Sequence, residues 1–338
     1  MRKIFFLLFI TCNFSLVSFS QATFKQTDIL KSYKEAEELI NLGKYAVAQP
    51  FLQDFLQKYE NKTLDKSNLI YADAIYLKAL CEKETASPEA EKDLQYFADN
   101  FKGHPKTNNA YFHLGDLAYA KSNYNDALAF FDKVDEKSLT GKDVTEFQYK
   151  RAFANFALKK FSQARMYFNQ IAVNKKHPYN EEGYYYSGLS SYYLKDYNAA
   201  YKSFQQLELS KKYGKIVPYY IASIKFINKD YKGVVDYAEP KLKENVSYQN
   251  EITHLLGSSY NELKDYDKAL YYLEKYTQNS AKVTPEDYYV LGYVQSQKGK
   301  CDKAIENLLQ LSPLQTALGQ NAMFLLGQCY EKTGNKSD

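Results

Sequence analysis

The sequence has little cysteine, little excess charge and none of the common short motifs of catalysis. Only four cysteines occur in 338 residues, with no CxxC and no Cys/His cluster, which excludes a disulfide framework and a zinc site of the usual spacing. The net charge of +4 is too small to favour a nucleic-acid backbone as partner. GxGxxG, GxxxxGK and HExxH are absent, so no phosphate cradle or zinc-protease site is indicated.

Histidine is equally scarce. His104, His113, His177 and His254 are far apart in the sequence, and two of them directly precede proline. The sequence gives no reason to place a general base beside a nucleophile, and general acid–base or nucleophilic catalysis needs such a pair. The sequence therefore predicts a protein that is not an enzyme and has no cofactor, catalytic site or metal site.

The first twenty residues differ in character from the rest. Arg2 and Lys3 precede the apolar run "IFFLLFI", and Ser18 and Ser20 place small residues before Gln21. This layout predicts a cleavable secretory signal over residues 1–20. A membrane anchor and acylation at Cys12 are the weaker alternatives, because the apolar run is short and the residues around Cys12 are bulky. The mature chain, 21–338, is expected to be exported and to reach a membrane only through a partner.

Tyrosine is abundant instead, at 34 residues, and seven lie in 184–204, "YYYSGLSSYYLKDYNAAYKSF". This stretch is one copy of a repeat. A small residue is followed after 9 residues by an aromatic one, after 12 by a second small one and after 16 by an aromatic residue or leucine. The second small position recurs at 127, 164, 200, 234, 269 and 304, in steps of 37, 36, 34, 35 and 35. The small landmarks are Gly115 and Ala127, Ala152 and Ala164, Gly188 and Ala200, Gly257 and Ala269, Gly292 and Ala304, and Gly327.

A period near 34 with these landmarks resembles the tetratricopeptide repeat (TPR) family. Earlier copies, one at Gly43 and a degenerate one at 70–100, extend the resemblance over nearly all of 28–334. The resemblance implies an all-α fold, a right-handed superhelical solenoid of antiparallel helix pairs with about eight full repeats and a partial ninth. Turns such as Lys195-Asp196 are expected between the helices of a pair.

In TPR proteins the first helix of each repeat lines a concave groove. The repeat register assigns a set of aromatic residues to this groove, where packing alone does not require them. The alternative is that these rings are buried against neighbouring repeats. A clamp for a C-terminal carboxylate is disfavoured, because Asn109 alone fits its pattern. The predicted partner-binding residues are Phe112, Tyr119, Tyr149, Phe153, Phe156, Tyr185, Tyr192, Tyr193, Tyr219 and Phe226.

The expected function is a protein–protein interaction scaffold that binds other envelope proteins or peptide segments. The signal and the Lys/Asn/Tyr-rich composition suggest the periplasm or outer-membrane periphery of a Gram-negative bacterium, as in periplasmic TPR proteins of the Tol–Pal-associated and outer-membrane-assembly families. A glycan or peptidoglycan recognition module, and an N-terminal docking domain of a larger protein, are the alternatives.

Two features near the C-terminus leave questions open. Residues 322–338 match a first helix, and the next landmark is expected at position 339. We therefore expect either a chain that continues beyond 338 or an uncapped face that docks a partner. Cys301 and Cys329 are expected at neighbouring helix ends, where they are either bridged or two separate small hydrophobic residues.

Overall fold

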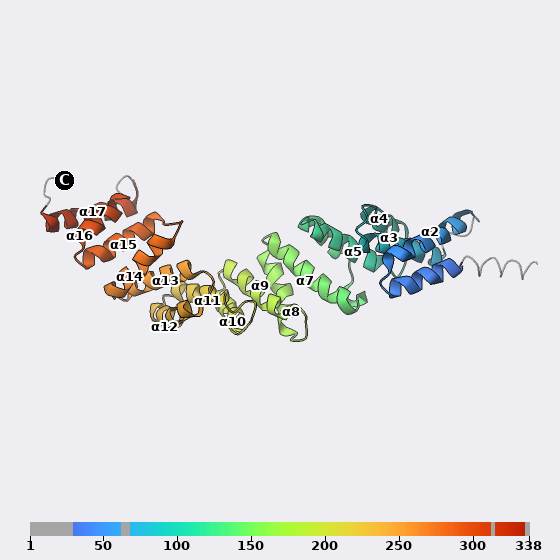
Figure 1. Cartoon of the computed structure of the whole chain (residues 1–338), viewed down its shortest axis with the longest axis horizontal. Helices are drawn as coiled ribbons and strands as arrows, with labels where there is room; N and C mark the ends of the chain where they lie inside the picture. Colours follow the sequence, from blue (N-terminus) through green and yellow to red (C-terminus); the bar gives the residue numbers. More distant parts are fainter. Residues whose placement is uncertain (1–29, 62–67, 312–314, 335–338) are drawn as a thin grey trace, which may run out of the picture. The chain divides into compact units, whose positions relative to one another are not determined.

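The computed structural model describes residues 30–61, 68–311 and 315–334, and all regular structure in these ranges is helical (Figure 1). The predicted signal, 1–20, lies outside the described residues. No helix in the described ranges combines the length and apolar character needed to cross a membrane.

The helices follow one another as eight pairs and one further helix, as the repeat predicted. The pairs are residues 30–41 with α2 (Tyr45–Asn61), α3 (Leu69–Glu84) with α4 (Ala90–Asn100), α5 (Thr107–Ala120) with α6 (Tyr124–Phe131), α7 (Gly141–Ala157) with α8 (Phe161–Val173), α9 (Asn180–Tyr193) with α10 (Tyr197–Gln205), α11 (Val217–Ile227) with α12 (Tyr231–Lys241), α13 (Gln249–Glu262) with α14 (Tyr266–Asn279), and α15 (Pro285–Gln297) with α16 (Cys301–Leu309); α17 (Ala317–Thr333) follows.

The chain divides into two compact units, which are described separately below. Unit 1 extends to Gln163 and unit 2 begins at Ala164, so the boundary falls inside α8. Short 3₁₀ helices lie at Glu136–Ser138 in unit 1 and Leu242–Glu244 in unit 2.

The turns within helix pairs share one backbone conformation. Lys195, Lys229 and Lys264 each adopt a left-handed φ of about 60°. The next residue is an aspartate whose carboxylate accepts a hydrogen bond from the backbone N–H three residues later and so caps the second helix; an example is Asp196, which accepts from Ala199 at 3.2 Å. A left-handed residue reverses the chain and the cap satisfies a helix N–H that has no partner within the helix. The predicted Lys195-Asp196 turn is confirmed.

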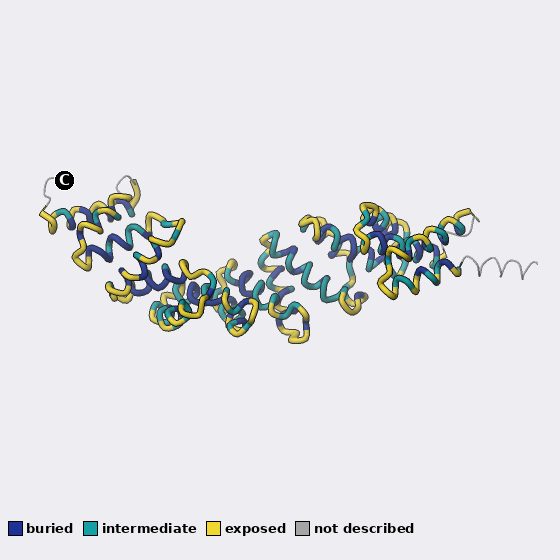
Figure 2. Tube along the Cα trace, viewed as in Figure 1, coloured by how far each residue is buried: buried dark blue, intermediate teal, exposed yellow. Residues whose placement is uncertain are grey.

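The small landmarks lie where the two helices of a pair touch. Ala127, Ala200, Ala269 and Ala304 have no exposed surface. A Cβ added to Gly188 would lie 2.8 Å from Cε1 of Phe204, sixteen residues later, which is closer than real contacts allow. Buried positions accordingly follow the helix faces that meet, and exposed positions lie at the turns and outer faces (Figure 2). The landmarks are therefore packing positions.

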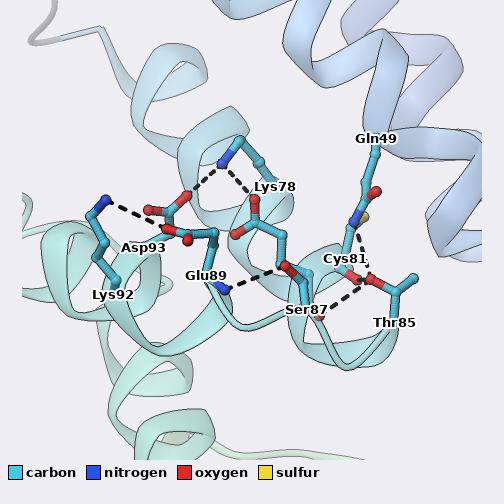
Figure 3. Close-up of polar contacts among 9 residues, drawn as sticks. Gln49, Lys78, Cys81, Thr85, Ser87, Glu89, Lys92 and Asp93 are labelled. Carbon is cyan, nitrogen blue, oxygen red and sulfur yellow. Dashed lines mark hydrogen bonds and ion pairs between the residues drawn. The ribbon is translucent and has the colours of Figure 1, made fainter.

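The degenerate repeat at 70–100 forms a helix pair with polar contacts around its turn (Figure 3). The Lys78 ammonium of α3 bonds the carboxylates of Glu82 at 2.6 Å and of Asp93 on α4. The Thr85 hydroxyl donates to the Cys81 carbonyl at 2.8 Å at the end of α3. The Lys78–Asp93 pair thus joins α3 to α4 where the repeat landmarks are weakest, and Thr85 caps the end of α3.

Cys301 and Cys329 lie in one core cluster formed by α15, α16 and α17. Their thiols are free and in hydrogen-bond contact. Burial, with the contact to Cys301 added, raises the pKa of the Cys329 thiol to about 12. The predicted proximity is confirmed, and in this structure the pair packs as two small hydrophobic side chains.

Replacing Gly257 by leucine should destabilise the fold. A Cβ at this position would lie 2.8 Å from Cγ of Leu273, so the two helices must separate. We expect the free energy of unfolding in urea to fall by about 1–3 kcal/mol, although leucine is the better helix former. Gly327→Leu is the control, because a Cβ there meets nothing within 4 Å. Equal stability of Gly257→Leu and the wild type would contradict the packing role.

Candidate functional site

Four of the five predicted partner-binding residues of unit 1 form a half-buried aromatic surface. Phe153 is at its centre, with ring centroids 6.0 Å from Tyr119, 6.0 Å from Tyr149 and 6.3 Å from Phe156. Phe156 in turn contacts Phe161 at 5.7 Å. Rings from α5 and α7 therefore hold one another in place. We call Tyr119, Tyr149, Phe153 and Phe156 the aromatic face of unit 1.

Phe112 behaves differently from the other predicted residues of unit 1. It is only 3% exposed and belongs to the core cluster that contains Phe131 and Phe147. Its ring contacts Phe147 edge-on at 6.4 Å. Phe112 is therefore buried against a neighbouring repeat, which was the alternative to a place in the groove.

A cluster of paired charges borders the aromatic face of unit 1. Asp116 of α5 bonds Lys150 of α7, and its other carboxylate oxygen lies 3.1 Å from the ammonium of Lys83 on α3. Lys150 also lies 3.1 Å from Glu146 and over the ring of Tyr119, 5.9 Å from its centroid. The side chains of Lys83, Asp116 and Lys150 are at most 19% exposed. The cluster therefore links three helices of unit 1 beneath a partly exposed ring surface.

Two opposing effects act on the Asp116 carboxylate. Burial raises its pKa, but the hydrogen bond and charge of Lys150, with the charge of Lys83 added, outweigh burial and hold the pKa below its ordinary value. Asp116 is thus ionised at neutral pH and compensates both lysines. The two cations are consequently engaged within unit 1.

The predicted partner-binding residues of unit 2 lie in a larger group of tyrosines. Tyr185 stacks on Tyr213 with centroids 4.4 Å apart, and Tyr192 contacts Tyr193 at 6.2 Å and Tyr220 at 5.8 Å. The tyrosine cluster, as we call it, comprises Tyr185, Tyr192, Tyr193, Tyr213, Tyr219, Tyr220 and Tyr248. Its members come from α9, α11 and the segments that precede α11 and α13.

Tyr248 extends the tyrosine cluster beyond α11. Tyr248, directly before α13, lies 5.1 Å from Tyr219 and 6.2 Å from Tyr220. Tyr193 is 54% exposed and Tyr248 is 42% exposed, whereas Tyr213 is buried. The cluster therefore has a packed base and an exposed rim.

Hydroxyl contacts fix the rings of the tyrosine cluster. The Tyr192 hydroxyl lies 2.9 Å from the Ser223 hydroxyl, and the hydroxyls of Tyr185 and Tyr220 are hydrogen-bonded to each other. Burial raises the pKa of Tyr185 and Tyr220, and that of Tyr213 to about 12. All three phenols are neutral at physiological pH, so this surface is amphipathic without carrying charge.

Phe226 lies at the end of α11 and outside the tyrosine cluster. Its ring contacts Tyr231 at 5.5 Å, and it packs against the core that α12, α13 and α14 share. Of the five residues predicted in unit 2, the structure thus brings Tyr185, Tyr192, Tyr193 and Tyr219 together and places Phe226 apart.

Tyr213, Tyr220 and Tyr248 belong to the cluster but were not predicted, because the repeat register assigned the surface to selected first-helix positions. The spacing of tyrosines before the first helices could have indicated two of them, Tyr213 and Tyr248. Tyr179 and Tyr248 lie nine residues before the landmarks Gly188 and Gly257, and Tyr213 lies nine residues before Ala222, the small residue that precedes position 234 by 12 residues. Each of these residues precedes the first helix of its repeat, and Tyr213 and Tyr248 contact rings of the preceding repeat.

His113, His254 and Asp287 are engaged in structural contacts. Burial lowers the pKa of His113 to about 3, and its Nε2 lies 3.2 Å from the Tyr76 hydroxyl. His254 Nε2 lies 2.7 Å from the Asp287 carboxylate, which also caps α15 through Thr284. No group of three or more His, Cys, Asp or Glu side chains in 30–61, 68–311 and 315–334 is placed to hold a metal ion.

Asp116→Asn should destabilise unit 1 in a pH-dependent way. Removal of the charge leaves Lys83 and Lys150 poorly compensated, and we expect a loss of about 1–3 kcal/mol in the free energy of unfolding at pH 7. The pKa of Asp116 is lower in the folded state than in the unfolded state. The Asp116 charge therefore stabilises the fold fully above the unfolded-state pKa, which is near 4, and this stabilisation is lost as the pH falls through the folded-state pKa. Urea unfolding between pH 3 and pH 7 should show the two proteins converging in acid.

Asp132→Asn is the matched control for that experiment. Asp132 pairs with Arg151 at 3.2 Å, but its side chain is 66% exposed, so the expected loss is below about 1 kcal/mol. A difference between Asp116→Asn and the wild type that is small at pH 7, or that grows in acid, would show that the charge cluster does not stabilise unit 1.

Comparisons with known proteins agree with the helix-pair architecture. Two family models, both described as tetratricopeptide repeat, match residues 87–138 and 254–282. A search of curated proteins finds no match. Among solved structures, a tetratricopeptide repeat protein from Parabacteroides merdae is 15% identical and aligns over 76% of this chain and 98% of its own, with a TM-score of 0.43.

Two further structures are similar over most of their length. PilF of Pseudomonas aeruginosa is 16% identical over 64% of this chain and 96% of its own, with a TM-score of 0.49. The apo form of RapI is 12% identical over 91% of this chain and 99% of its own, with a TM-score of 0.50. At 12% identity the likeness to RapI concerns the fold alone. The repeat landmarks, the helix pairs and the two family models that match parts of this chain together support a tetratricopeptide repeat protein.

Proposed function

We propose that this protein is an exported, non-catalytic scaffold of a bacterial cell envelope that holds a partner segment against the tyrosine cluster of unit 2. The role as an interaction scaffold rests on the fold, because TPR folds serve protein–protein interaction in general. The finer assignment rests on one observation, the convergence of seven tyrosines from successive repeats on one partly exposed surface.

The chemistry of the tyrosine cluster suits a protein partner. Tyrosine offers a large rigid ring together with a hydroxyl, and such side chains dominate the binding energy of many interfaces. Mutual ring contacts hold the cluster in one arrangement, so little conformational entropy is lost when a partner binds. A segment with apolar side chains and free backbone carbonyls would fill the rim and accept hydrogen bonds from its hydroxyls.

Some of the cations beside the two aromatic surfaces are already paired. Lys212, which lies over the ring of Tyr213, bonds the Glu182 carboxylate, and Lys83 and Lys150 share Asp116. To bind these lysines, the C-terminal carboxylate of a partner would have to displace one of these acids. The geometry therefore supports recognition of an apolar or aromatic segment over a carboxylate clamp.

A glycan-binding module is the second candidate, and the aromatic face of unit 1 favours it. There Asp116 and Lys150 lie beside Tyr119, which is the mixture of polar groups and rings that sugars require. The polar groups already satisfy one another, however, whereas the hydroxyls of a sugar need donors and acceptors that are free. Protein binding is accordingly the better supported function.

The exposed rim of the tyrosine cluster should carry the binding. We expect Tyr193→Ala combined with Tyr248→Ala to weaken partner binding at least tenfold, because rim rings that contact the partner contribute about 1–2 kcal/mol each. The measurement is quantitative capture from the envelope extract of the source bacterium with residues 21–338 as bait, followed by titration of the captured protein.

Tyr271→Ala is the matched control for the rim variants. Tyr271 is 60% exposed on α14 and lies outside the tyrosine cluster. Circular dichroism should show that all variants keep their helix content. Capture that is equal for the wild type and the rim variant would refute binding at the cluster, and capture of oligosaccharide alone would favour the second candidate.

Export of the chain can be tested apart from binding. We expect the protein from the source bacterium to occur in the envelope fraction with Gln21 at its N-terminus, because signal peptidase recognises the small residues Ser18 and Ser20. Mass spectrometry of the N-terminal peptide checks this, with Ser18→Phe combined with Ser20→Phe as the variant that should accumulate unprocessed. A cytoplasmic protein that begins at residue 1 would exclude the proposed location.

A further inference from the structure

One edge of the tyrosine cluster combines two rings with a carboxylate. Tyr219 of α11 and Tyr248, directly before α13, have ring centroids 5.1 Å apart. Glu251 lies in the first turn of α13, three residues after Tyr248, and is exposed. Burial raises the pKa of Tyr219, and the neighbouring Tyr192 and Glu251 raise it further, so the Glu251 charge acts on the Tyr219 hydroxyl. We call Tyr219, Tyr248 and Glu251 the Glu251 corner.

The backbone holds the Glu251 corner in one arrangement. Tyr248 adopts the left-handed conformation, with φ 59° and ψ 38°, which is unusual for a bulky side chain. Its ring contacts Tyr219 and also Tyr220, whose centroid is 6.2 Å away. The backbone N–H of Ser247 donates to the Lys215 carbonyl at 2.8 Å. These contacts keep Tyr248 in its strained conformation, so the corner is formed before a partner arrives.

The Glu251 carboxylate lacks a cation. Among the described residues it makes no ion pair and no side-chain hydrogen bond, and no cation lies over the ring of Tyr219 or Tyr248. Lys215, on the connector before α11, is exposed and makes no ion pair with Glu251. The face of a tyrosine ring carries negative potential and attracts cations, and a carboxylate beside it adds to that attraction. The corner is therefore suited to a positive charge.

Other parts of the protein show how such a combination is filled. Lys268 lies 4.8 Å from the ring centroid of Tyr260 and 3.8 Å from the Glu239 carboxylate. The same grouping of a lysine with an acid and a tyrosine ring occurs at Lys212 with Glu182 and Tyr213, Lys225 with Asp230 and Tyr201, Lys106 with Asp73 and Tyr76, and Lys150 with Asp116 and Tyr119. The Glu251 corner offers the acid and the rings without the lysine.

We propose that the Glu251 corner binds a lysine or arginine side chain of the partner segment, which pairs with Glu251 and lies against the rings of Tyr219 and Tyr248. The inference rests on the proposed function, because it states what the segment held at the tyrosine cluster must carry. The apolar side chains of that segment lie along the rest of the rim, towards Tyr193. Charge complementarity at one edge thus fixes the register of a segment that neutral rings alone would hold loosely.

The first test reads the preference from a random peptide library. Phage that display random twelve-residue peptides are selected on residues 21–338 and, separately, on the Glu251→Lys variant. The wild type should enrich lysine and arginine beside apolar residues by about threefold or more over the library, and Glu251→Lys should abolish that enrichment. A wild type that selects no basic peptides, or an enrichment that Glu251→Lys leaves unchanged, overturns the proposal.

Glu286→Lys is the matched control for that selection. Glu286 lies in the first turn of α15, as Glu251 does in α13, and is exposed. The two substitutions make the same change to the net charge and to the charge at a helix N-terminus, but only Glu251 borders the tyrosine cluster. The basic preference should survive Glu286→Lys. An equal loss in both variants would attribute the preference to the overall charge and refute the corner.

The second test isolates the cationic group. A selected peptide is synthesised with a fluorescent label, together with a version in which citrulline, an uncharged analogue of arginine, replaces each basic residue. In anisotropy titrations the wild type should bind the charged peptide about fivefold more tightly than the citrulline peptide, whereas Glu251→Gln should bind the two alike. Equal binding of both peptides by the wild type would overturn the proposal.

The variant with Tyr193→Ala and Tyr248→Ala separates this inference from the proposed function. Circular dichroism checks that each variant keeps its helix content. If this rim variant loses the charged peptide while Glu251→Gln binds it as the wild type does, the tyrosine cluster holds a segment without a cation and only this inference falls. If the rim variant binds the charged peptide as the wild type does, the cluster is not the binding surface and both fall.

Discussion

The close contact between the two helices of each pair is the constraint on which the rest of this protein depends. Where the first helix carries glycine, as at Gly188, the ring of Phe204 packs directly on its backbone. That ring then stacks on Tyr220 of the next repeat, with centroids 5.0 Å apart. Tyr220 in turn contacts Tyr192 and Tyr248. The absence of a side chain at Gly188 thus determines where the Phe204 ring lies, and Phe204 in turn positions the tyrosine cluster.

This dependence explains why tyrosine serves both the core and the surface. A phenylalanine such as Phe204 is fully buried, but the tyrosines around it must also satisfy a hydroxyl. Tyr192 does so with Ser223, and Tyr220 with Tyr185. Rings whose hydroxyls need partners or water remain near the surface, so an array rich in tyrosine presents amphipathic surfaces as a consequence of how it packs.

The two units apply the same architecture to different surface chemistry. In unit 1 the charges of Lys83, Asp116 and Lys150 join three helices beneath the aromatic face, whereas in unit 2 hydroxyls and ring stacking hold the tyrosine cluster. The repeat family establishes the fold and a general role in binding, but specificity must come from such local differences. A neutral tyrosine surface and a charge-bordered one would select different segments.

The sequence alone determined the helix pairs, their period and their turns, because small landmarks and capping aspartates act over a few residues. It also placed Gly327 in register with Gly292 of the preceding repeat. Tertiary structure alone decided that Phe112 is buried, that Tyr213, Tyr220 and Tyr248 join the tyrosine cluster, and that Lys83 and Lys150 share Asp116. Periodicity reports which side of a helix a residue occupies. Exposure and pairing on that side depend on side chains that lie far away in the chain, often in the next repeat.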